Sequence, residues 1–269
     1  MRVHQPALLH HKRFKIVSWL YHDVTDSPGE SGFQNPNARI YKISVSHFIR
    51  NLAHILGSGC LLRTITNPEN KSNFNTLSLN YLTFDDGGVS AMTAADILDL
   101  NNVKGHFFIT TNKIGCPGFM GESQIRELHE RGHVVGSHSH THPSRFDILT
   151  SDKMFQEWSI STRILAKITG QPTVAGSVPG GNVNHRVVQA AGLAGIRHLF
   201  TSCPTYQTRL LSGVQIYGRL RVRRSTTLLL CRWGSHMYMI WPITALWYLK
   251  RVVRNVVMQE QKESSREIW

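Results

Sequence analysis

The sequence predicts an α/β fold built around a parallel sheet or barrel. Apolar segments typical of buried strands alternate with segments whose apolar residues recur at helical spacing, through at least five cycles. The candidate functional residues follow the strand-like segments, and α/β barrels place their chemistry at that end of the strands. With 269 residues, of which 41% are hydrophobic, the chain can form one large domain or two small ones.

In the first half, strands are predicted at residues 15–21, 79–84, 105–110 and around the valine pair at 134–135. Helices are predicted from Ser44 or Ser46, at residues 90–101, and from residue 122 to a stop at Gly132. The first of these helices would bury a face made of Phe48, Ile49, Leu52 and Ile55.

In the second half, a helix begins at Ser151 and runs through Ile168, where a Gly-Gln-Pro sequence ends it. A second helix is predicted at residues 185–193. Strands are predicted at residues 174–178, 196–201 and 215–222.

Three histidines lie at alternate positions directly after the valine pair. If the strand continues, His138, His140 and His142 point to one face, because strand side chains alternate. If the chain turns instead, His138 and His142 are four residues apart and can still close on one ion. Imidazole is the commonest metal ligand, so the segment indicates a metal site, and a polar loop of hydrogen-bonded histidines is the alternative.

Two adjacent carboxylates follow the strand predicted at residues 79–84. Asp85 and Asp86 cannot both point into an apolar core, and the two glycines after them allow a sharp turn. One carboxylate can join two histidines in a site that keeps a position for water, while its neighbour takes a proton from that water. The Asp-Asp-Gly-Gly segment at residues 85–88 alone predicts only a turn, but together with the histidines it predicts a metal site.

These two motifs together resemble the first two motifs of the polysaccharide deacetylase (NodB-homology) family, carbohydrate esterase family four. They read TFDDG at residues 83–87 and, about fifty residues later, HSxxH at residues 138–142. Three further segments are similar to the family: YHDV at 21–24, GHFFI at 105–109, and SVPGG at 177–181 in the place of the third motif. The resemblance covers roughly residues 16–225 and implies a distorted (β/α) barrel with about seven strands.

The resemblance implies metal-assisted deacetylation of an acetamido sugar, in polysaccharide biosynthesis or modification. The ligands of a divalent ion, expected to be Zn²⁺ with Co²⁺ or another divalent ion as alternatives, would be Asp86, His138 and His142. Asp85 would act as general base on the water. The backbone near Pro179 and Gly180 would stabilise the oxyanion, and His140 would take no part.

The second half departs from the family pattern in three ways. Ser177 stands where the family has an arginine that orients the base, no Asp or Glu occurs from 158 to 259, and the late strand lacks the general-acid histidine. His22 is a candidate for the missing acid. Arg219 is a candidate contact for an anionic substrate, with a plain surface position as the alternative.

The formal charge is +13, and the acid-free second half must present a positive field. This favours an anionic partner, such as an acidic polysaccharide, a lipid-linked pyrophosphate sugar or a membrane surface. The alternative is a basic surface without a specific partner. No nucleic-acid recognition motif is present, so we expect no specific nucleic acid.

The four cysteines show no close pairing or zinc spacing and predict thiols in a reducing compartment. The first residues lack the long apolar core of a secretory signal, so we expect a cytoplasmic location, with membrane association as an option.

We expect a basic N-terminal segment at residues 1–15, the barrel at 16–225 and an aromatic, basic, helical tail at 226–269. The tail is expected to pack on the barrel, and an interfacial helix in peripheral contact with a membrane is the alternative.

Two other functions stay open. The same two motifs can serve a metal-dependent hydrolase of another non-peptide C–N amide bond. The missing general acid also allows a catalytically impaired member of the family that binds carbohydrate or membranes.

Overall fold

The computed structural model describes residues 15–66, 78–226 and 245. The interpretations of residues 1–15 as a basic segment and of residues 226–269 as a helical tail therefore fall, apart from residues 15, 226 and 245, outside the described residues. None of the helices in the described part has the length and apolar character needed to cross a membrane.

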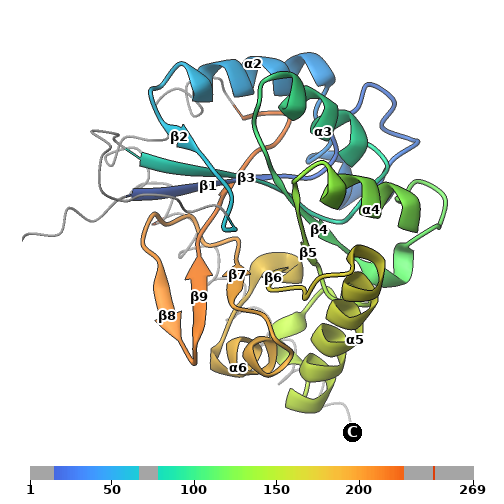
Figure 1. Ribbon diagram of the computed structural model, residues 1–269, viewed down its shortest axis with the longest axis vertical. Helices are drawn as coiled ribbons and strands as arrows, with labels where there is room; N and C mark the ends of the chain where they lie inside the picture. Colours follow the sequence, from blue (N-terminus) through green and yellow to red (C-terminus); the bar gives the residue numbers. More distant parts are fainter. Residues whose placement is uncertain (1–14, 67–77, 227–244, 246–269) are drawn as a thin grey trace, which may run out of the picture.

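One curled sheet organises the described chain (Figure 1). The neighbours along it follow the order β10-β1-β3-β4-β5-β6-β7-β9-β8, and β2 pairs with β3 beside this path. All pairs are parallel except the β8–β9 hairpin. The strands are β1 (Lys15–Tyr21), β2 (Leu61–Leu62), β3 (Ser78–Phe84), β4 (His106–Ile109), β5 (Val134–Ser137), β6 (Ala175–Ser177), β7 (His198–Phe200), β8 (Arg209–Leu211), β9 (Val214–Tyr217) and β10 (Leu220–Arg221).

The α/β fold with a distorted barrel is confirmed, as a half-barrel. The sheet has ten strands rather than about seven, because the short β2, β8 and β10 have only two or three residues each and give no periodic signal of their own.

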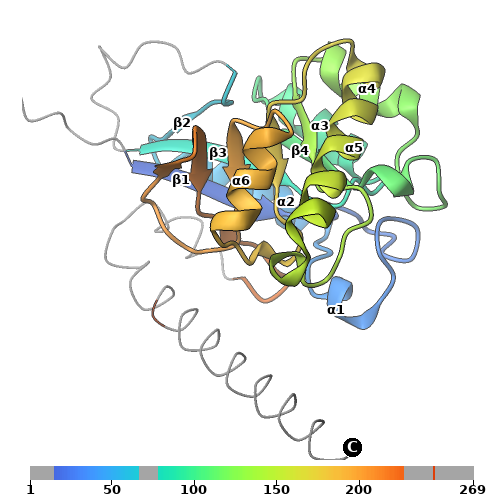
Figure 2. The same cartoon turned by 90° about the horizontal axis from the view of Figure 1, so that it is seen from below.

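Helices cover the outside of the curl (Figures 1 and 2). They are α1 (Pro36–Arg39), α2 (Val45–Leu56), α3 (Ala91–Leu100), α4 (Glu122–Glu130), α5 (Ser151–Thr169) and α6 (His185–Leu193), with short 3-10 turns at Thr111–Lys113, Phe146–Ile148 and Pro179–Gly181. Side-chain caps at Ser44, Thr150 and Asn184 begin α2, α5 and α6. Gly170, at φ 72°, ends α5 as predicted.

The buried face of α2 differs from the prediction at one position. Phe48, Leu52 and Ile55 are buried as expected, but Ile49 is 48% exposed and Asn51 is fully buried. A face defined by residues 48, 52 and 55 turns position 51 inward and position 49 outward, since residues three and four apart share a helix face.

Strand register brings the expected functional segments to one edge of the sheet. Tyr21 lies opposite Phe84, so His22 and Asp85 leave neighbouring strands at the same level. The Asp85 amide donates to the Tyr21 carbonyl at 3.0 Å, which holds the two exits together.

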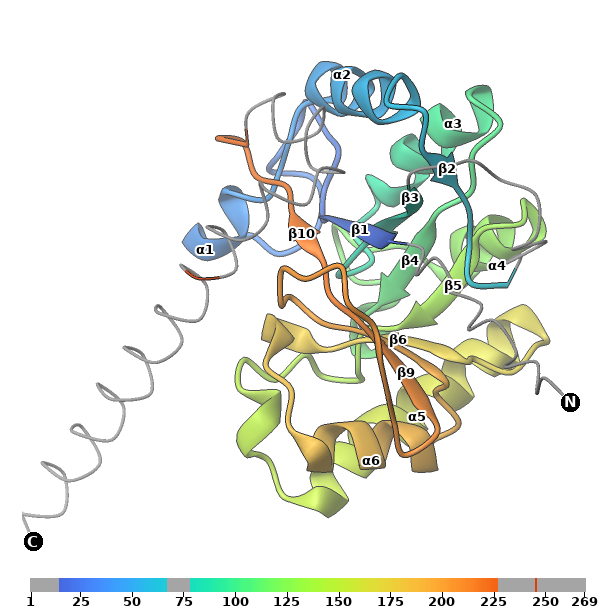
Figure 3. The same ribbon diagram turned by 90° about the vertical axis from the view of Figure 1, so that its left-hand side faces the viewer.

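The strand predicted at 215–222 is in fact two strands that lie at opposite ends of the sheet order. β9 pairs with β7, whereas β10 pairs with β1 (Figure 3). Only Gly218 and Arg219 connect them, and two residues reach a few ångströms each, so the two ends of the sheet must curl towards one another. A side chain at 218 would collide with the Cys203 carbonyl, and Arg219 donates its amide to that same carbonyl at 2.9 Å.

A buried histidine, His106, attaches the segment that follows β2 to strand β3. Its Nε2 accepts from the Ile65 amide at 3.1 Å, so its Nδ1 carries the proton and donates to the Leu82 carbonyl at 3.0 Å. Burial lowers the pKa of His106 to about 4, so the ring is neutral at pH 7.

Stability should therefore fall as the pH falls from about 6.5 to about 4. In this window the unfolded chain binds a proton at position 106 that the folded chain does not, which costs up to about 1.4 kcal/mol of unfolding free energy per pH unit. Urea unfolding at pH 7, 6 and 5 should give a shallower pH dependence for His106→Gln than for the wild type. The exposed His185→Gln variant should keep the wild-type slope, and equal slopes for wild type and His106→Gln would contradict the interpretation.

Candidate active site

The structure brings one carboxylate and two imidazoles together where β3 and β5 end. The ligand atoms of Asp86, His138 and His142 all lie within 4.8 Å of one another. Nε2 of His138 and of His142 are 3.4 and 3.5 Å from Oδ1 of Asp86. Asp86 and His138 are buried, and the side chain of His142 is 27% exposed, so the group opens to solvent on the His142 side.

The backbone turns sharply between the two histidines. β5 ends at Ser137, and Ser139 and His142 adopt left-handed conformations with φ 63° and 58°. The possibility of a continuing strand is therefore wrong, and the four-residue spacing of the turn brings His138 and His142 together. His140 points elsewhere, with Nδ1 2.9 Å from Thr111 Oγ1. Non-glycine residues with positive φ are uncommon and need surrounding contacts to hold them.

Glu157 on α5 supplies the main contact of this kind. Its Oε2 accepts the amides of His140 and Thr141 at 2.9 and 2.8 Å, and its Oε1 accepts the Thr141 hydroxyl at 2.6 Å. Ser139 Oγ accepts the His142 amide at 3.1 Å. The turn that presents His142 is thus fixed by a carboxylate nineteen residues after His138, and no motif in the sequence pointed to this residue.

The donor set fits a divalent cation. His138 places Nδ1 2.9 Å from the Ser177 carbonyl, and a carbonyl only accepts, so Nδ1 carries a proton and Nε2 faces Asp86. Burial would lower the pKa of His138, but the charges of Asp85 and Asp86 raise it, so an ion that binds Nε2 replaces a second proton there. Burial and the neighbouring His138 charge lower the pKa of His142 to about 4, so this imidazole is neutral at pH 7. Burial would raise the pKa of Asp86, but the hydrogen bond from His138 and the charges of His22 and His138 lower it well below its usual range. A carboxylate and two imidazoles are typical ligands of catalytic zinc sites.

Asp85, the neighbour of Asp86, is held by a buried arginine. Arg219 donates from Nη1 to Oδ1 at 2.7 Å and from Nη2 to Oδ2 at 2.8 Å, and only 1% of this arginine is exposed. Its other donors reach Thr83 Oγ1, Ser177 Oγ and the Thr201 carbonyl, so the guanidinium is fully hydrogen-bonded by protein atoms. Burial would raise the pKa of Asp85, but the charge of Arg219 outweighs it and holds that pKa below its usual range.

The comparisons with known proteins agree with this geometry. The family model "Polysaccharide deacetylase" matches residues 77–199. Residues 77–199 therefore belong to the polysaccharide deacetylase family. A peptidoglycan-N-acetylglucosamine deacetylase of Listeria monocytogenes is 35% identical over 115 residues, which are 42% of this chain and 23% of that protein.

Solved structures show the same fold. A polysaccharide deacetylase from Bacillus cereus superposes with a TM-score of 0.66 and 22% identity, over 82% of this chain and 68% of the other. IcaB from Ammonifex degensii gives 0.67 and 19%, over 82% and 96%. This chain matches less than half the length of the curated relatives.

The expected position of Arg219 as a substrate contact or surface residue is wrong, because its guanidinium is buried against Asp85. In the polysaccharide deacetylase pattern an arginine at the position of Ser177 orients the base. Here the Ser177 hydroxyl donates to Asp85 Oδ2 at 3.0 Å and accepts from Arg219 Nη2 at 2.7 Å. The arginine thus comes from the link between β9 and β10. The only sequence signal was a Gly-Arg pair inside an otherwise strand-like segment.

The remaining predicted residues surround this centre. His22 follows β1, and its charge acts on Asp85, Asp86 and His142. Its ring stacks on Tyr41, with centroids 4.5 Å apart. In the turn after β6, Pro179 is buried and Gly180 is exposed with φ 66°.

Moving the arginine back to its family position tests this interpretation. Arg219→Ser leaves Asp85 buried without a cation and should lower the unfolding free energy by about 3–5 kcal/mol. The double variant Ser177→Arg/Arg219→Ser supplies a guanidinium from β6 and should recover most of that loss in urea unfolding at pH 7. The exposed Arg163→Ser should change the unfolding free energy by only about 0.5 kcal/mol. If the double variant is no more stable than Arg219→Ser, Arg219 stabilises the link between β9 and β10 and not the charge of Asp85.

Proposed function

We propose that this protein is a metal-dependent deacetylase that hydrolyses the acetamido group of an N-acetylated amino sugar in an oligo- or polysaccharide. The observation that carries the proposal is the convergence of Asp86, His138 and His142 within 4.8 Å, with the ionised Asp85 beside them. The names of the curated relatives, which are deacetylases of peptidoglycan sugars, support the same reaction class.

The reaction adds water to the acetyl carbon, breaks the C–N bond, and leaves acetate and a free amine. A divalent ion held by Asp86, His138 and His142, expected to be Zn²⁺, would polarise the acetyl carbonyl and acidify the attacking water. Asp85 accepts the proton of that water. Its Oδ2 lies 3.8 Å from Nε2 of His138, so the base stands next to the ligands, and the two bonds from Arg219 keep it ionised and prevent rotation of the carboxylate.

The leaving amine needs a proton, and His22 is the residue we propose to supply it. His22 follows the strand next to the Asp85 strand, so it approaches the centre from a second strand. Tyr41 covers one face of its imidazole and fixes the orientation of the ring. The exposed turn at Gly180, next to Ser177, would bring a backbone amide to the developing oxyanion.

The buried Arg219 favours turnover over a catalytically impaired binding protein. The sequence lacks the family's arginine and its general acid at their usual positions, and the missing acid motivated the impaired alternative. Arg219 occupies the place of the first, and His22 stands where it can replace the second. We also propose the cytoplasmic side as the location, which the free thiols of Cys60, Cys116 and Cys203 support.

Two variants should distinguish the residues that bind the metal from the residue that acts as the base. Purified protein loaded with Zn²⁺ or Co²⁺ should release acetate from tetra-N-acetylchitotetraose and lose this activity with a chelator. Asp86→Ala should lose bound metal and activity together. Asp85→Asn should keep stoichiometric metal while kcat falls about 10²–10⁴-fold, because the base is missing.

Metal content by mass spectrometry and acetate release are the two measurements. His140→Asn, in the same segment but pointing away, should keep bound metal. Protein that binds no added metal, or that releases no acetate when loaded, would refute the proposed function.

The role of His22 can be tested through the leaving group. His22→Ala should lower kcat on the acetamido sugar about 10²–10⁴-fold with little change in KM, because protonation of the amine is lost. Hydrolysis of p-nitrophenyl acetate should change far less, because nitrophenolate leaves without a proton. An equal loss on both substrates would assign His22 a structural role.

A further inference from the structure

Arg223 emerges at the same edge of the sheet as the candidate active site. β10 runs parallel to β1, with Arg221 opposite Leu20, and the Val222 amide donates to the Leu20 carbonyl at 2.9 Å. β10 and β1 lie side by side (Figure 3), so Arg223, two residues after Arg221, leaves its strand beside His22. None of the motifs in the sequence pointed to Arg223.

Stacked side chains hold Arg223 in place. The guanidinium carbon lies 5.3 Å from the centroid of the Tyr41 ring, and Nη2 donates to the Tyr41 hydroxyl at 3.3 Å. The same ring stacks on His22. Arg223 and the proposed acid thus contact the same ring, and Arg223 is partly exposed.

The charge of Arg223 is not neutralised within residues 15–66 and 78–226. The arginine ion pairs in this part of the chain belong to Arg131, Arg145 and Arg219. The bond to Tyr41 uses one of the five N–H donors of Arg223. A fixed, partly exposed guanidinium with donors to spare suits a carboxylate or phosphate oxygen.

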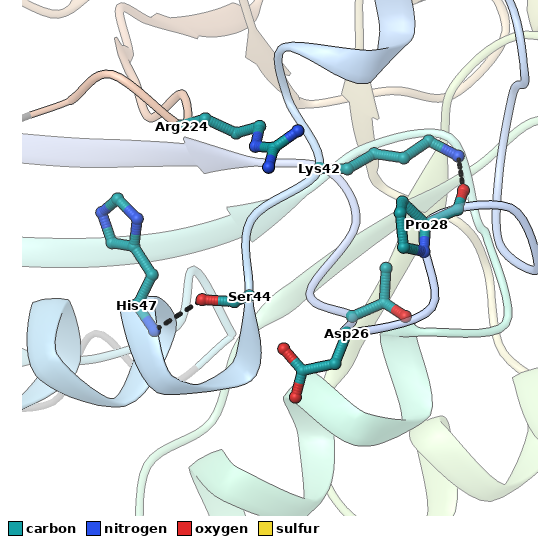
Figure 4. A pocket seen from close by; sticks show the side chains of 7 residues that line it. Asp26, Pro28, Lys42, Ser44, His47 and Arg224 are labelled. Carbon is teal, nitrogen blue, oxygen red and sulfur yellow. Dashed lines mark hydrogen bonds between the residues drawn. The ribbon is translucent and has the colours of Figure 1, made fainter.

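The neighbouring cavity is a weaker candidate for an anion. It has a volume of about 330 Å³ and is lined by Arg224, Lys42 and Asp26 among others (Figure 4). The Lys42 ammonium donates to the carbonyls of Pro28 and Ser31 and lies 3.8 Å from Asp23, so it is already occupied. The Asp26 carboxylate would repel an anion in this cavity, whereas no carboxylate of the described residues forms an ion pair with Arg223.

We propose that Arg223 binds an anionic substituent, a carboxylate or a phosphate, carried by the glycan next to the acetamido group. This inference rests on the proposed function and names the substrate class of the same site. It assigns to Arg223 the contact that the sequence suggested for Arg219, whose guanidinium is fully used by Asp85 and its neighbours. The substrate is then an acidic glycan.

Binding can be measured without turnover in the metal-loaded Asp85→Asn variant. Calorimetry would compare neutral tetra-N-acetylchitotetraose with two anionic glycans of the same length. One carries the lactyl carboxylate of N-acetylmuramic acid, and the other carries a phosphate. We expect at least one anionic glycan to bind about tenfold more tightly than the neutral one, and the arm that does so identifies the anion.

Adding Arg223→Gln should lower the preference for the anionic glycan about tenfold. Arg163→Gln, which removes the same charge from an exposed position on α5, should leave it intact. Arg223→Lys keeps the charge but not the fork, so it should give an intermediate preference and serves as the test variant if Arg223→Gln does not fold.

Equal affinity for neutral and anionic glycans, or a preference unchanged by both Arg223 variants, overturns the proposal. Acetate release from the neutral glycan by the wild type would then still support the proposed function. Conversely, the protein could prefer anionic glycans through Arg223 and yet release no acetate. That result would support the anion subsite and refute the proposed deacetylase function.

Discussion

The buried ion pair between Asp85 and Arg219 is the contact on which both the site and the closure of the sheet depend. Asp85 directly follows β3, and Arg219 belongs to the two-residue link between β9 and β10. In a low-dielectric interior an unpaired charge is costly, so each member of the pair requires the other. Because Arg219 can reach Asp85 only if the ends of the sheet curl around it, the contact that orients the base also selects the curled form of the sheet.

The path of the chain explains why Arg219, between β9 and β10, can hold the Asp85 carboxylate. After β9 the chain leaves one end of the sheet order and joins β1 at the other. It crosses at the carboxyl edge, where Asp85 and Ser177 leave β3 and β6. From this link the Arg219 side chain reaches Asp85 and Ser177. The short Ser177 side chain on β6 leaves space for the guanidinium, which a longer side chain at position 177 would occupy. The departure at Ser177 and the position of Arg219 are therefore one change.

Local periodicity was enough to predict most elements, and motif spacing was enough to predict the metal ligands. The strand at residues 15–21 and the helix at residues 185–193 have the bounds that the sequence predicts. The contact of Arg219 with Asp85 spans 134 residues and has no local signature, so no pattern within a window could show it. The turn between His138 and His142 was also hidden, because its left-handed residues are Ser139 and His142 rather than glycines. Contacts from Glu157, on a separate helix, impose that conformation.

The uneven charge of the chain acquires a physical meaning from these contacts. Glu157 is the last acidic residue before the acid-free stretch, and it is used to hold the turn that carries His142. An arginine between residues 158 and 226 has no acidic residue within that stretch, so its counter-charge comes from another part of the chain, as Arg219 takes it from Asp85, or from a ligand. Arg223 leaves the sheet at the same edge as the metal ligands and faces outward beside Tyr41. A positive field at the mouth of a cleft attracts anions over distances of about a Debye length, ~8 Å at physiological salt. The same lack of acidic residues that removes the family's own charge relay thus leaves Arg223 without a carboxylate partner among the described residues, and the proposal of an acidic glycan depends on this unpaired charge.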